Sequence, residues 1–563
     1  MVNTPRIRSS VSRAPASART RQSASAARAE ASTLEGYTAD HHFLATFGVR
    51  PALAWTVVSF AVVYFAIITF RFAPGNAWLF GLLIAGEVFH LWQLATYAHT
   101  VVGRTRPAPF TAAFTEPVDI FITVAGEPIA VVEETIRAAK AIEYPDFRVF
   151  VLNDGYVAKK DNWREIETLA SLLGVTCITR RTPGGNKAGN INHALRLTRS
   201  PFVVVFDADH VPHPDFLKRT MGYFSDPKMG FVQTPQFYRN RDTNIVTAAA
   251  WEQQELFYGA ICRGKDRVNA AFLCGTNMVI RRVALEDVGG IREDNIAEDI
   301  ITSLFLHRRG WKSVYVPSVL AEGLAPEDMY SYTRQQFRWA RGSLEIIFRH
   351  NPLFWRELSF SQRIQYLASA SYYLSGLVVL MNALLPLVFL FTGAVPLAVT
   401  TMALAAVFLP YIFATVYLLL LSSNFTYTFR ALAFSMSAFP VHVRAFGATL
   451  LRRENVFQVT AKEAVSNNDT RLAAPHIVYA AVVVLGTAVA LAREGITASV
   501  VTNFSWALFN VAVFLPFIYA ALPIAQRRAL RLRSGQAARA VAPAAEPVAA
   551  AETIPVEAES VAS

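Results

Sequence analysis

The stretch Pro201-Phe202-Val203-Val204-Val205-Phe206-Asp207-Ala208-Asp209-His210 decides how the rest of the chain is interpreted. Its five β-branched or aromatic residues predict a buried strand over residues 202–206. Residues two apart on a strand point the same way, so Asp207 and Asp209 can share one cation at the carboxyl end of that strand. Ligands of open α/β sheets bind at this edge, which favours a metal-bound diphosphate there. Taken alone, an Asp-x-Asp motif arises by chance, and a solvated turn is the alternative.

The composition indicates a membrane protein with one large soluble domain. Of the 563 residues, 53% are hydrophobic and only 17% are charged. The net charge of +11 comes largely from tails and from residues beside apolar runs, a placement that favours orientation in a membrane and excludes nucleic acid as the expected partner. The three cysteines, Cys177, Cys262 and Cys274, form no CxxC pair or metal-ligand spacing and indicate a reducing compartment.

Six apolar runs are long enough to cross a bilayer. They are residues 51–70, 77–97, 366–392, 395–421, 475–492 and 500–523. The second run contains Glu87 and His90 on one helical face, where they contact protein or a water-filled path, or else lie near an interface. Basic residues precede the fifth run and follow the sixth. By the positive-inside rule, we expect both termini and the soluble domain on the cytoplasmic side of the cell (inner or plasma) membrane.

The chain divides into five parts. We expect a disordered basic tail over residues 1–48, two membrane helices over residues 49–100 and a soluble catalytic domain over residues 115–350. A second membrane region with interfacial helices is expected over residues 351–525, and a disordered tail over residues 526–563. Two stretches that mix aromatic residues with arginine, 353–363 and 427–451, lie along the membrane surface or form buried helices.

Short apolar runs alternate with amphipathic stretches in the soluble part. Strands are predicted over residues 119–124, 148–152, 175–179 and 202–206, and helices over residues 131–141, 163–172 and 188–197. This alternation predicts βαβ units and a largely parallel sheet.

Polar residues follow several of these strands. Glu127 lies in the turn after the first strand, and Asp154 follows the second, where it could hold a base or ribose through hydrogen bonds. Lys187 lies in the basic loop 184–190, before a helix, and could bring a cation and backbone N–H groups to phosphate. Each of these features alone is also compatible with an ordinary loop at a strand end.

Two later motifs add further chemistry. Glu298 and Asp299 stand at the start of a predicted helix, where a carboxylate could serve chemistry or cap the helix. Gln335, Arg338 and Trp339 lie within about one helical turn. Arginine and amide groups can neutralise a departing diphosphate, and an indole can stack on a sugar ring or pack in the core.

The order Asp154-Gly155, Asp207-x-Asp209, Glu298-Asp299 and Gln335-x-x-Arg338-Trp339 resembles the processive family 2 glycosyltransferases, the cellulose synthase and hyaluronan synthase group. The resemblance covers roughly residues 50–525. Residues 232–236 and 272–276 are similar to acceptor-side segments of that group. Residues 457–462 resemble the FxVTxK gating loop of cellulose synthases.

The resemblance implies a GT-A domain with a mixed, mostly parallel sheet, inserted in an α-helical bundle of about six membrane helices. It implies a UDP-sugar donor, most simply UDP-glucose, with Mg²⁺ or Mn²⁺ held by Asp207 and Asp209. The donor-side residues would be Glu127, Asp154, Lys187, Asp207, Gln335 and Arg338. Asp299 would be the general base. The acceptor-side residues would be Cys274, Glu298 and Trp339, and the gating loop at 455–465 would contain Phe457, Val459, Thr460 and Lys462.

The product implied is a β-glucan exported across the bilayer, with the growing polysaccharide as acceptor and accessory export subunits as possible partners. Gly126, Asn153 and Ala297 depart from the residues common in the group. No cyclic-di-GMP-binding domain is expected after the last span, and six spans are fewer than in bacterial cellulose synthases. Two alternatives stay open: single sugar transfer to a lipid phosphate, and a transporter with a nucleotide-sensing domain.

Overall fold

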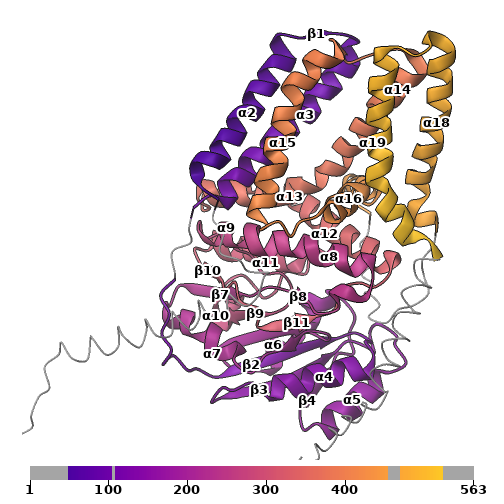
Figure 1. Cartoon of the computed structure of the whole chain (residues 1–563). Helices are drawn as coiled ribbons and strands as arrows, with labels where there is room; N and C mark the ends of the chain where they lie inside the picture. The colour runs from indigo at the N-terminus through magenta and orange to yellow at the C-terminus, as the bar shows by residue number, and fades with distance from the viewer. Residues whose placement is uncertain (1–48, 104–107, 454–469, 524–563) are drawn as a thin grey trace, which may run out of the picture.

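The computed structural model describes residues 49–103, 108–453 and 470–523. An upright bundle of long helices stands on a domain built around a sheet, and a layer of helices separates the two (Figure 1). Both ends of the described chain lie at the end of the bundle that faces the sheet domain (Figure 1).

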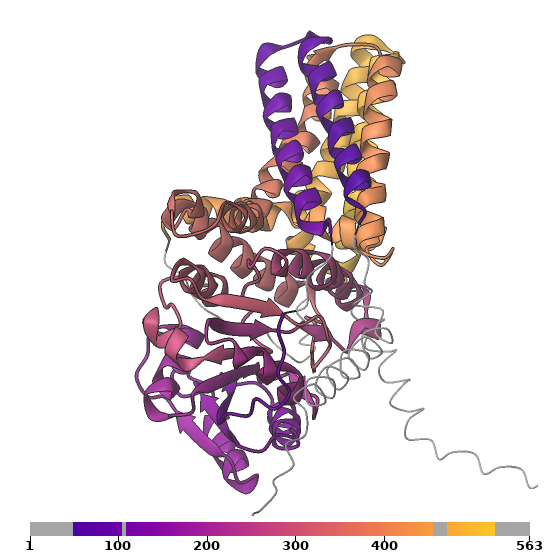
Figure 2. The ribbon, with the colours of Figure 1, turned by 90° about the vertical axis from the view of Figure 1, so that its left-hand side faces the viewer.

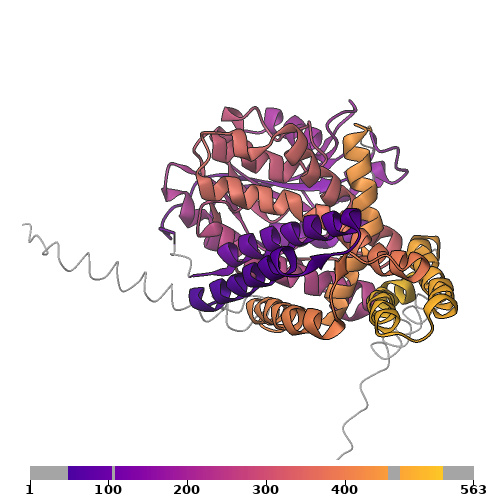
Figure 3. The ribbon, with the colours of Figure 1, turned by 90° about the horizontal axis from the view of Figure 1, so that it is seen from above.

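Six helices in the described part of the chain are long and apolar enough to cross a membrane, as predicted. They are α2 (Pro51–Phe70), α3 (Ala77–Val101), α14 (Ser375–Thr392) with the preceding α13 (Phe360–Ser371), α15 (Thr401–Ser422), α18 (Ala474–Glu494) and α19 (Ala498–Ala521). From above, the yellow α18 and α19 lie to one side of the indigo α2 and α3 (Figure 3). The helix predicted from residue 395 begins instead at Thr401, because β12 (Leu397–Ala398) pairs with β1 (Ala73–Pro74) in an antiparallel ladder between helices.

The predicted strands are present as β2 (Val118–Val124), β3 (Phe147–Asn153), β4 (Thr176–Thr179) and β5 (Phe202–Asp207). Three further strands, β7 (Met229–Gln233), β9 (Met278–Arg281) and β10 (Lys312–Tyr315), complete a seven-stranded sheet of order β10-β7-β9-β5-β2-β3-β4. Only β9 runs antiparallel to its neighbours, β5 and β7. The sheet is therefore mixed and mostly parallel.

Helices cover both faces of this sheet, so its central strands are apolar on both sides. On one face, Ile122 and Phe206 pack against Val132 of α4 (Ile129–Lys140). On the other face, Phe121 and Val205 belong to the same cluster as Ile191 of α6 (Asn186–Leu197). The third predicted helix is α5 (Trp163–Leu172).

The strand order reverses between β2 and β5. From β2 the chain adds β3 and β4 on one side, then returns to place β5 on the other side. Ligands of open α/β sheets bind at such a switch point, at the carboxyl ends of the strands. Thr123 of β2 is paired in register with Asp207 of β5, so the Asp-Ala-Asp stretch begins at this point.

The layer between sheet and bundle contains α8 (Ile245–Glu255), the π-helical η4 (Leu256–Cys262), α9 (Arg263–Asp266), α11 (Glu298–Arg308), α12 (Met329–Arg349), α16 (Phe429–Ser437) and α17 (Phe439–Leu450). Figure 2 shows this layer lying across the base of the upright helices. In α16, Phe434 is fully buried whereas Phe429 is 53% exposed. The stretch 427–451 therefore forms helices that pack against protein on one side and leave apolar groups exposed on the other.

The stretch 353–363 is also exposed in part. It contains the end of η5 (Pro352–Phe354) and the start of α13, and Phe354 and Phe360 are 80% and 75% exposed. A wholly buried helix is therefore not formed by this stretch, and its place along the membrane surface stays a prediction.

Candidate active site

One open cleft lies at the carboxyl ends of β2, β3 and β5, with a volume of about 1100 Å³ including the space open to solvent. Every sequence-predicted site residue that the structure describes lines it: Glu127, Asp154, Lys187, Asp207, Asp209, Cys274, Glu298, Asp299, Gln335, Arg338 and Trp339. Residues separated by more than 200 positions in the chain thus meet in one space. The gating-loop residues Phe457, Val459, Thr460 and Lys462 lie outside the described residues.

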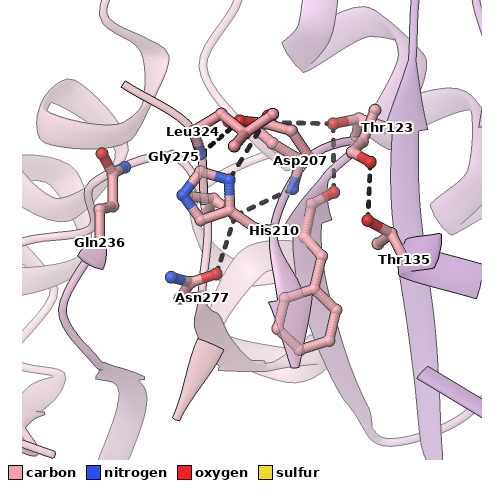
Figure 4. A network of polar contacts seen from close by, with 12 residues as sticks. Thr123, Thr135, Asp207, His210, Gln236, Gly275, Asn277 and Leu324 are labelled. Atoms are coloured by element: carbon pink, nitrogen blue, oxygen red, sulfur yellow. Dashed lines mark hydrogen bonds and ion pairs between the residues drawn. The ribbon is translucent and has the colours of Figure 1, made fainter. Parts of the chain in front are cut away.

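The backbone of the Asp-Ala-Asp turn is fixed by side chains from neighbouring segments (Figure 4). The Asp207 amide donates to Thr276 Oγ1 at 2.9 Å, and Thr123 Oγ1 donates to Asp207 Oδ1 at 3.2 Å. Thr135 of α4 donates to the Ala208 carbonyl at 2.7 Å. These bonds hold the turn so that Asp207 faces the cleft.

Asp209 and His210 are positioned by a small second sheet, in which β11 (Ala321–Gly323) lies between β6 (Val211–Pro212) and β8 (Phe237–Tyr238). The Leu324 amide donates to Asp209 Oδ2 at 3.1 Å. The His210 ring lies so close to Gly323 that a Cβ there would be 2.4 Å from Nε2. Only glycine at 323 leaves room for the imidazole.

Asp207, Asp209 and His210 can each offer one ligand atom, and these atoms lie within 4.8 Å of one another. His210 is 3% exposed, yet neither ring nitrogen makes a hydrogen bond. Its Nδ1 lies 3.5 Å from Asp209 Oδ1, and a buried imidazole without a hydrogen bond is unfavourable. Carboxylate oxygens are the donors that Mg²⁺ and Mn²⁺ prefer, and an imidazole nitrogen can add a ligand to a divalent metal. The residues present therefore fit a divalent cation. Sequence reasoning missed His210, although it stands directly after the two aspartates in the strand-end motif.

Lys187 lies at the start of α6, after a turn in which Gly185 and Asn186 have left-handed backbone (φ 64° and 47°). Its ammonium forms an ion pair with Asp207 and donates to the Gly275 carbonyl at 2.8 Å. Burial favours a lower pKa for Lys187, but the carboxylates of Asp207 and Glu298 outweigh it and raise that pKa. Burial likewise acts against a charged Asp207, and Lys187 outweighs it to lower the Asp207 pKa. Both side chains are thus charged at neutral pH.

Asn153 is the last residue of β3, and Asp154 follows it. Both Asp154 oxygens accept hydrogen bonds from Arg180, each at 2.7 Å. Asn153 donates from Nδ2 to the Trp163 carbonyl at 2.8 Å, while its Oδ1 accepts from the Gly155 amide at 3.0 Å. An ionised aspartate at position 153 has no N–H group to donate to the Trp163 carbonyl. Asparagine therefore has a local structural reason at this position, where the group commonly has aspartate.

Glu127 closes the turn after β2. Its Oε2 accepts from the Ala125 amide at 2.6 Å, and its own carbonyl accepts from Asn162 Nδ2 at 2.9 Å. Within this turn Gly126 has a left-handed φ of 102°. Glu127 therefore shapes the wall of the cleft near Asp154 as well as lining it.

Asp299 lies in the first turn of α11, beside Glu298. Its Oδ1 accepts from the Ile300 amide at 2.7 Å, and its Oδ2 would be 3.2 Å from a Cβ at Gly275. Burial, with the adjacent charge of Glu298, raises the Asp299 pKa from 3.8 to about 7. A carboxylate with such a pKa can take a proton near neutral pH, as a general base must.

The helix α12 contributes Gln335, Arg338 and Trp339 to the wall of the cleft. Its N-cap is Asp328, whose side chain accepts from the Ser331 amide. Gln335 is buried and donates to the Tyr238 hydroxyl at 3.4 Å. Trp339 is half-buried and faces the cleft, so it is not a core residue.

The two predicted acceptor-side segments lie side by side. The Cys274 amide donates to Gln233 Oε1 at 2.8 Å, and the Thr234 amide donates to the Asn277 carbonyl at 3.1 Å. Gln236 donates to the Cys274 carbonyl and itself lines the cleft. Cys274 is thereby held at the cleft wall.

Comparisons with known proteins agree with this geometry. Residues 116–342 match the family model described as "Glycosyltransferase like family 2", and residues 285–426 match the model "Cellulose synthase". Together with the mixed sheet and its switch-point cleft, they define a GT-A glycosyltransferase domain joined to membrane helices. The chain therefore carries a family 2 glycosyltransferase domain, which overlaps a segment that matches the cellulose synthase group.

Two relatives are cellulose synthase catalytic subunits described as UDP-forming. The protein from Pseudomonas fluorescens (strain SBW25) is 33% identical over 452 residues, which is 77% of this chain and 59% of that protein. The one from Xanthomonas axonopodis pv. citri (strain 306) is 36% identical over 307 residues, covering 53% of this chain and 40% of that protein. The chain thus spans less than two thirds of the length of these relatives.

Among solved structures, the mannosyltransferase PcManGT from Pyrobaculum calidifontis, in complex with GDP-Man and Mn²⁺, is 18% identical to this chain. It covers 71% of this chain and 100% of its own, with a TM-score of 0.46.

Proposed function

We propose that the chain is a processive, inverting glycosyltransferase that polymerises a UDP-sugar, most simply UDP-glucose, into a β-glucan and exports it through the membrane helices. One observation carries this proposal: a single cleft brings the cation cluster and Lys187 together with Asp299 and Trp339. Donor-side and acceptor-side chemistry are both required for sugar transfer. The relatives that are named as UDP-forming support UDP as the leaving group.

On the donor side, Glu127 and Asp154 would bind the nucleoside at the ends of β2 and β3. Asp207, Asp209 and His210 would hold Mg²⁺ or Mn²⁺, which supplies positive charge to the diphosphate when bound. Lys187, Gln335 and Arg338 line the same part of the cleft. Their donors would stabilise the negative charge that develops on UDP as the glycosidic bond breaks.

On the acceptor side, Asp299 would remove the proton from the attacking hydroxyl. Attack from the side opposite to UDP inverts an α-linked donor and gives a β-linked product. The Trp339 indole would stack on the terminal sugar of the acceptor, with Cys274 and Glu298 beside it. Glu298 has a second effect, because its negative charge helps to raise the pKa of Asp299.

The product would leave towards the bilayer, since the helix layer that contains α11 and α12 lies between the sheet and the bundle (Figure 1). We place the catalytic domain and both termini in the cytoplasm, in keeping with the basic segments beside the membrane helices. The proposal also includes accessory export subunits as partners.

The test uses the purified full chain in lipid vesicles, with a panel of UDP-sugars and either Mg²⁺ or Mn²⁺. We expect release of UDP together with a long polymer that a linkage-specific β-glucanase digests, only from the preferred donor. A chelator should abolish both. A single extractable glycolipid as the product would show one-step transfer instead of polymerisation. UDP-sugar that stays unchanged would contradict the enzyme activity altogether.

A further inference from the structure

Arg180 is a buried guanidinium at the carboxyl end of β4, and the mechanism proposed above gives it no role. Its side chain is 5% exposed. Nε and Nη2 donate to the two oxygens of Asp154, each at 2.7 Å. The same group binds two backbone carbonyls, because Nη1 donates to Gly184 and Nη2 donates to Asn186 at 3.1 Å. One side chain therefore joins two walls of the cleft.

The turn that Arg180 binds has an unusual backbone. Gly184, Gly185 and Asn186 all have positive φ, at 122°, 64° and 47°. A Gly-Gly sequence has many alternative conformations when nothing fixes it. Arg180 binds the carbonyls near both ends of this turn and so holds the turn in a single conformation.

The fit around the guanidinium is tight. A Cβ at Gly189 would lie 2.6 Å from Arg180 Nη1 and 2.4 Å from the Gly184 carbonyl oxygen. The first turn of α6 thus approaches Arg180 as closely as a residue without a side chain allows. Any larger residue at 189 would push the guanidinium, the turn, or both.

The two groups that Arg180 connects face the donor. Asp154 lines the part of the cleft proposed above to bind the nucleoside, and Lys187, which directly follows Asn186, contacts Asp207 where the diphosphate would bind. We infer that Arg180 is a positioning residue that fixes the Asp154 carboxylate relative to the Lys187 ammonium, so that the cleft fits one nucleoside diphosphate. The inference rests on the proposed function, because it takes a UDP-sugar as the donor.

The guanidinium is suited to this task because its planar fork can bind a carboxylate with two parallel bonds and still reach carbonyls on its other edge. A lysine keeps the charge but not the fork. Arg180→Lys should therefore leave Asp154 and the turn without a common anchor while the ion pair stays compensated.

The experiment measures UDP binding in the presence of Mn²⁺, and the kinetics with UDP-glucose, on the full chain. For Arg180→Lys we expect UDP affinity to fall about tenfold and KM for the donor to rise by a similar factor, because two charge-assisted bonds are lost. Since Arg180 does not touch the reacting atoms, kcat should change by less than about threefold.

The matched control is Arg282→Lys. Arg282 is equally a buried arginine, which binds Asp119 Oδ2 at 3.1 Å and the carbonyls of Ser200 and Leu195, but at the amino-terminal end of the central strands. Thermal stability should fall in both variants, whereas UDP affinity should fall only in Arg180→Lys.

Equal UDP affinity in the two variants would overturn the inference, as would a fall in kcat alone. If Arg180→Lys does not fold, Gly189→Ala tests the same contact from the helix side and should raise the donor KM in the same way. A native chain that binds no UDP would contradict the proposed function itself, which separates the two failures.

Discussion

Asp299 has an environment unlike that of an ordinary surface carboxylate. Partial burial at the start of α11, with Glu298 adjacent, raises its pKa to about 7. The Ile300 amide keeps Oδ1 oriented, and Gly275, which has no side chain, leaves room for Oδ2 at the cleft. This environment predicts how the reaction depends on pH.

A general base acts in its ionised form, so the rate should rise with pH through the Asp299 pKa. We expect kcat/KM to be about one-tenth of its plateau at pH 6 and to level off above pH 8. In Asp299→Asn we expect polymerisation to fall by at least about a thousandfold while UDP binding persists. Polymer yield across a pH series and UDP titration of the variant check both points. A profile that is flat between pH 5 and 8, or a variant that still polymerises, would contradict Asp299 as the base.

At the scale of elements, the contact between α3 and α9 joins the bundle to the catalytic domain. A Cβ at Gly264 would lie 2.0 Å from the Thr100 carbonyl oxygen. Beside it, the buried Lys265 donates to the Gln365 carbonyl at 2.8 Å, and Gln365 Nε2 donates to Thr100 Oγ1 at 2.9 Å. Burial lowers the Lys265 pKa to about 7. The end of α3, the helix α9 and the helix α13 are far apart in the chain but are therefore in direct contact here.

Gly264→Ala should separate these segments. Overpacking of this kind costs about 1–3 kcal/mol, which should lower the midpoint of thermal unfolding by a few degrees in detergent. The control is Gly81→Ala in α3, where nothing lies within 4 Å of the added methyl group. A midpoint that is the same in both variants would show that the junction adjusts without cost.

At the scale of the whole molecule, the even number of predicted crossings returns the chain to the side on which it began. Basic segments flank the spans on that side, whereas the loop between α18 and α19 carries little charge. The exposed Ile496 lies in this loop, at 86% exposure, and the exposed Leu172 lies in the sheet domain, at 79% exposure. These two positions can report the orientation of the chain.

Leu172→Cys and Ile496→Cys should react with a membrane-impermeant maleimide from opposite sides of the bilayer. In intact cells we expect labelling at residue 496 and none at residue 172, and in inverted membrane vesicles the reverse. The native chain, with its three less exposed cysteines, serves as the background. Labelling of both positions from one side would contradict the cytoplasmic placement of the catalytic domain.

The sequence alone determined the elements and most of the site. The strands and helices from residue 118 to 207 follow from apolar periodicity, because a sheet covered on both faces requires continuous apolar runs. The six spans follow from length and composition, since a bilayer demands about twenty apolar residues per crossing. The order of motifs was enough to name eleven of the residues that line the cleft, although not His210.

Tertiary structure decided what no local pattern contains. The place of His210 in the cation cluster depends on Gly323, which is more than a hundred residues further along the chain. The raised pKa of Asp299 depends on burial, and the role of Arg180 depends on a turn and a strand end that only the fold brings together. Such properties arise from contacts between distant segments, whereas periodicity and composition describe neighbours along the chain.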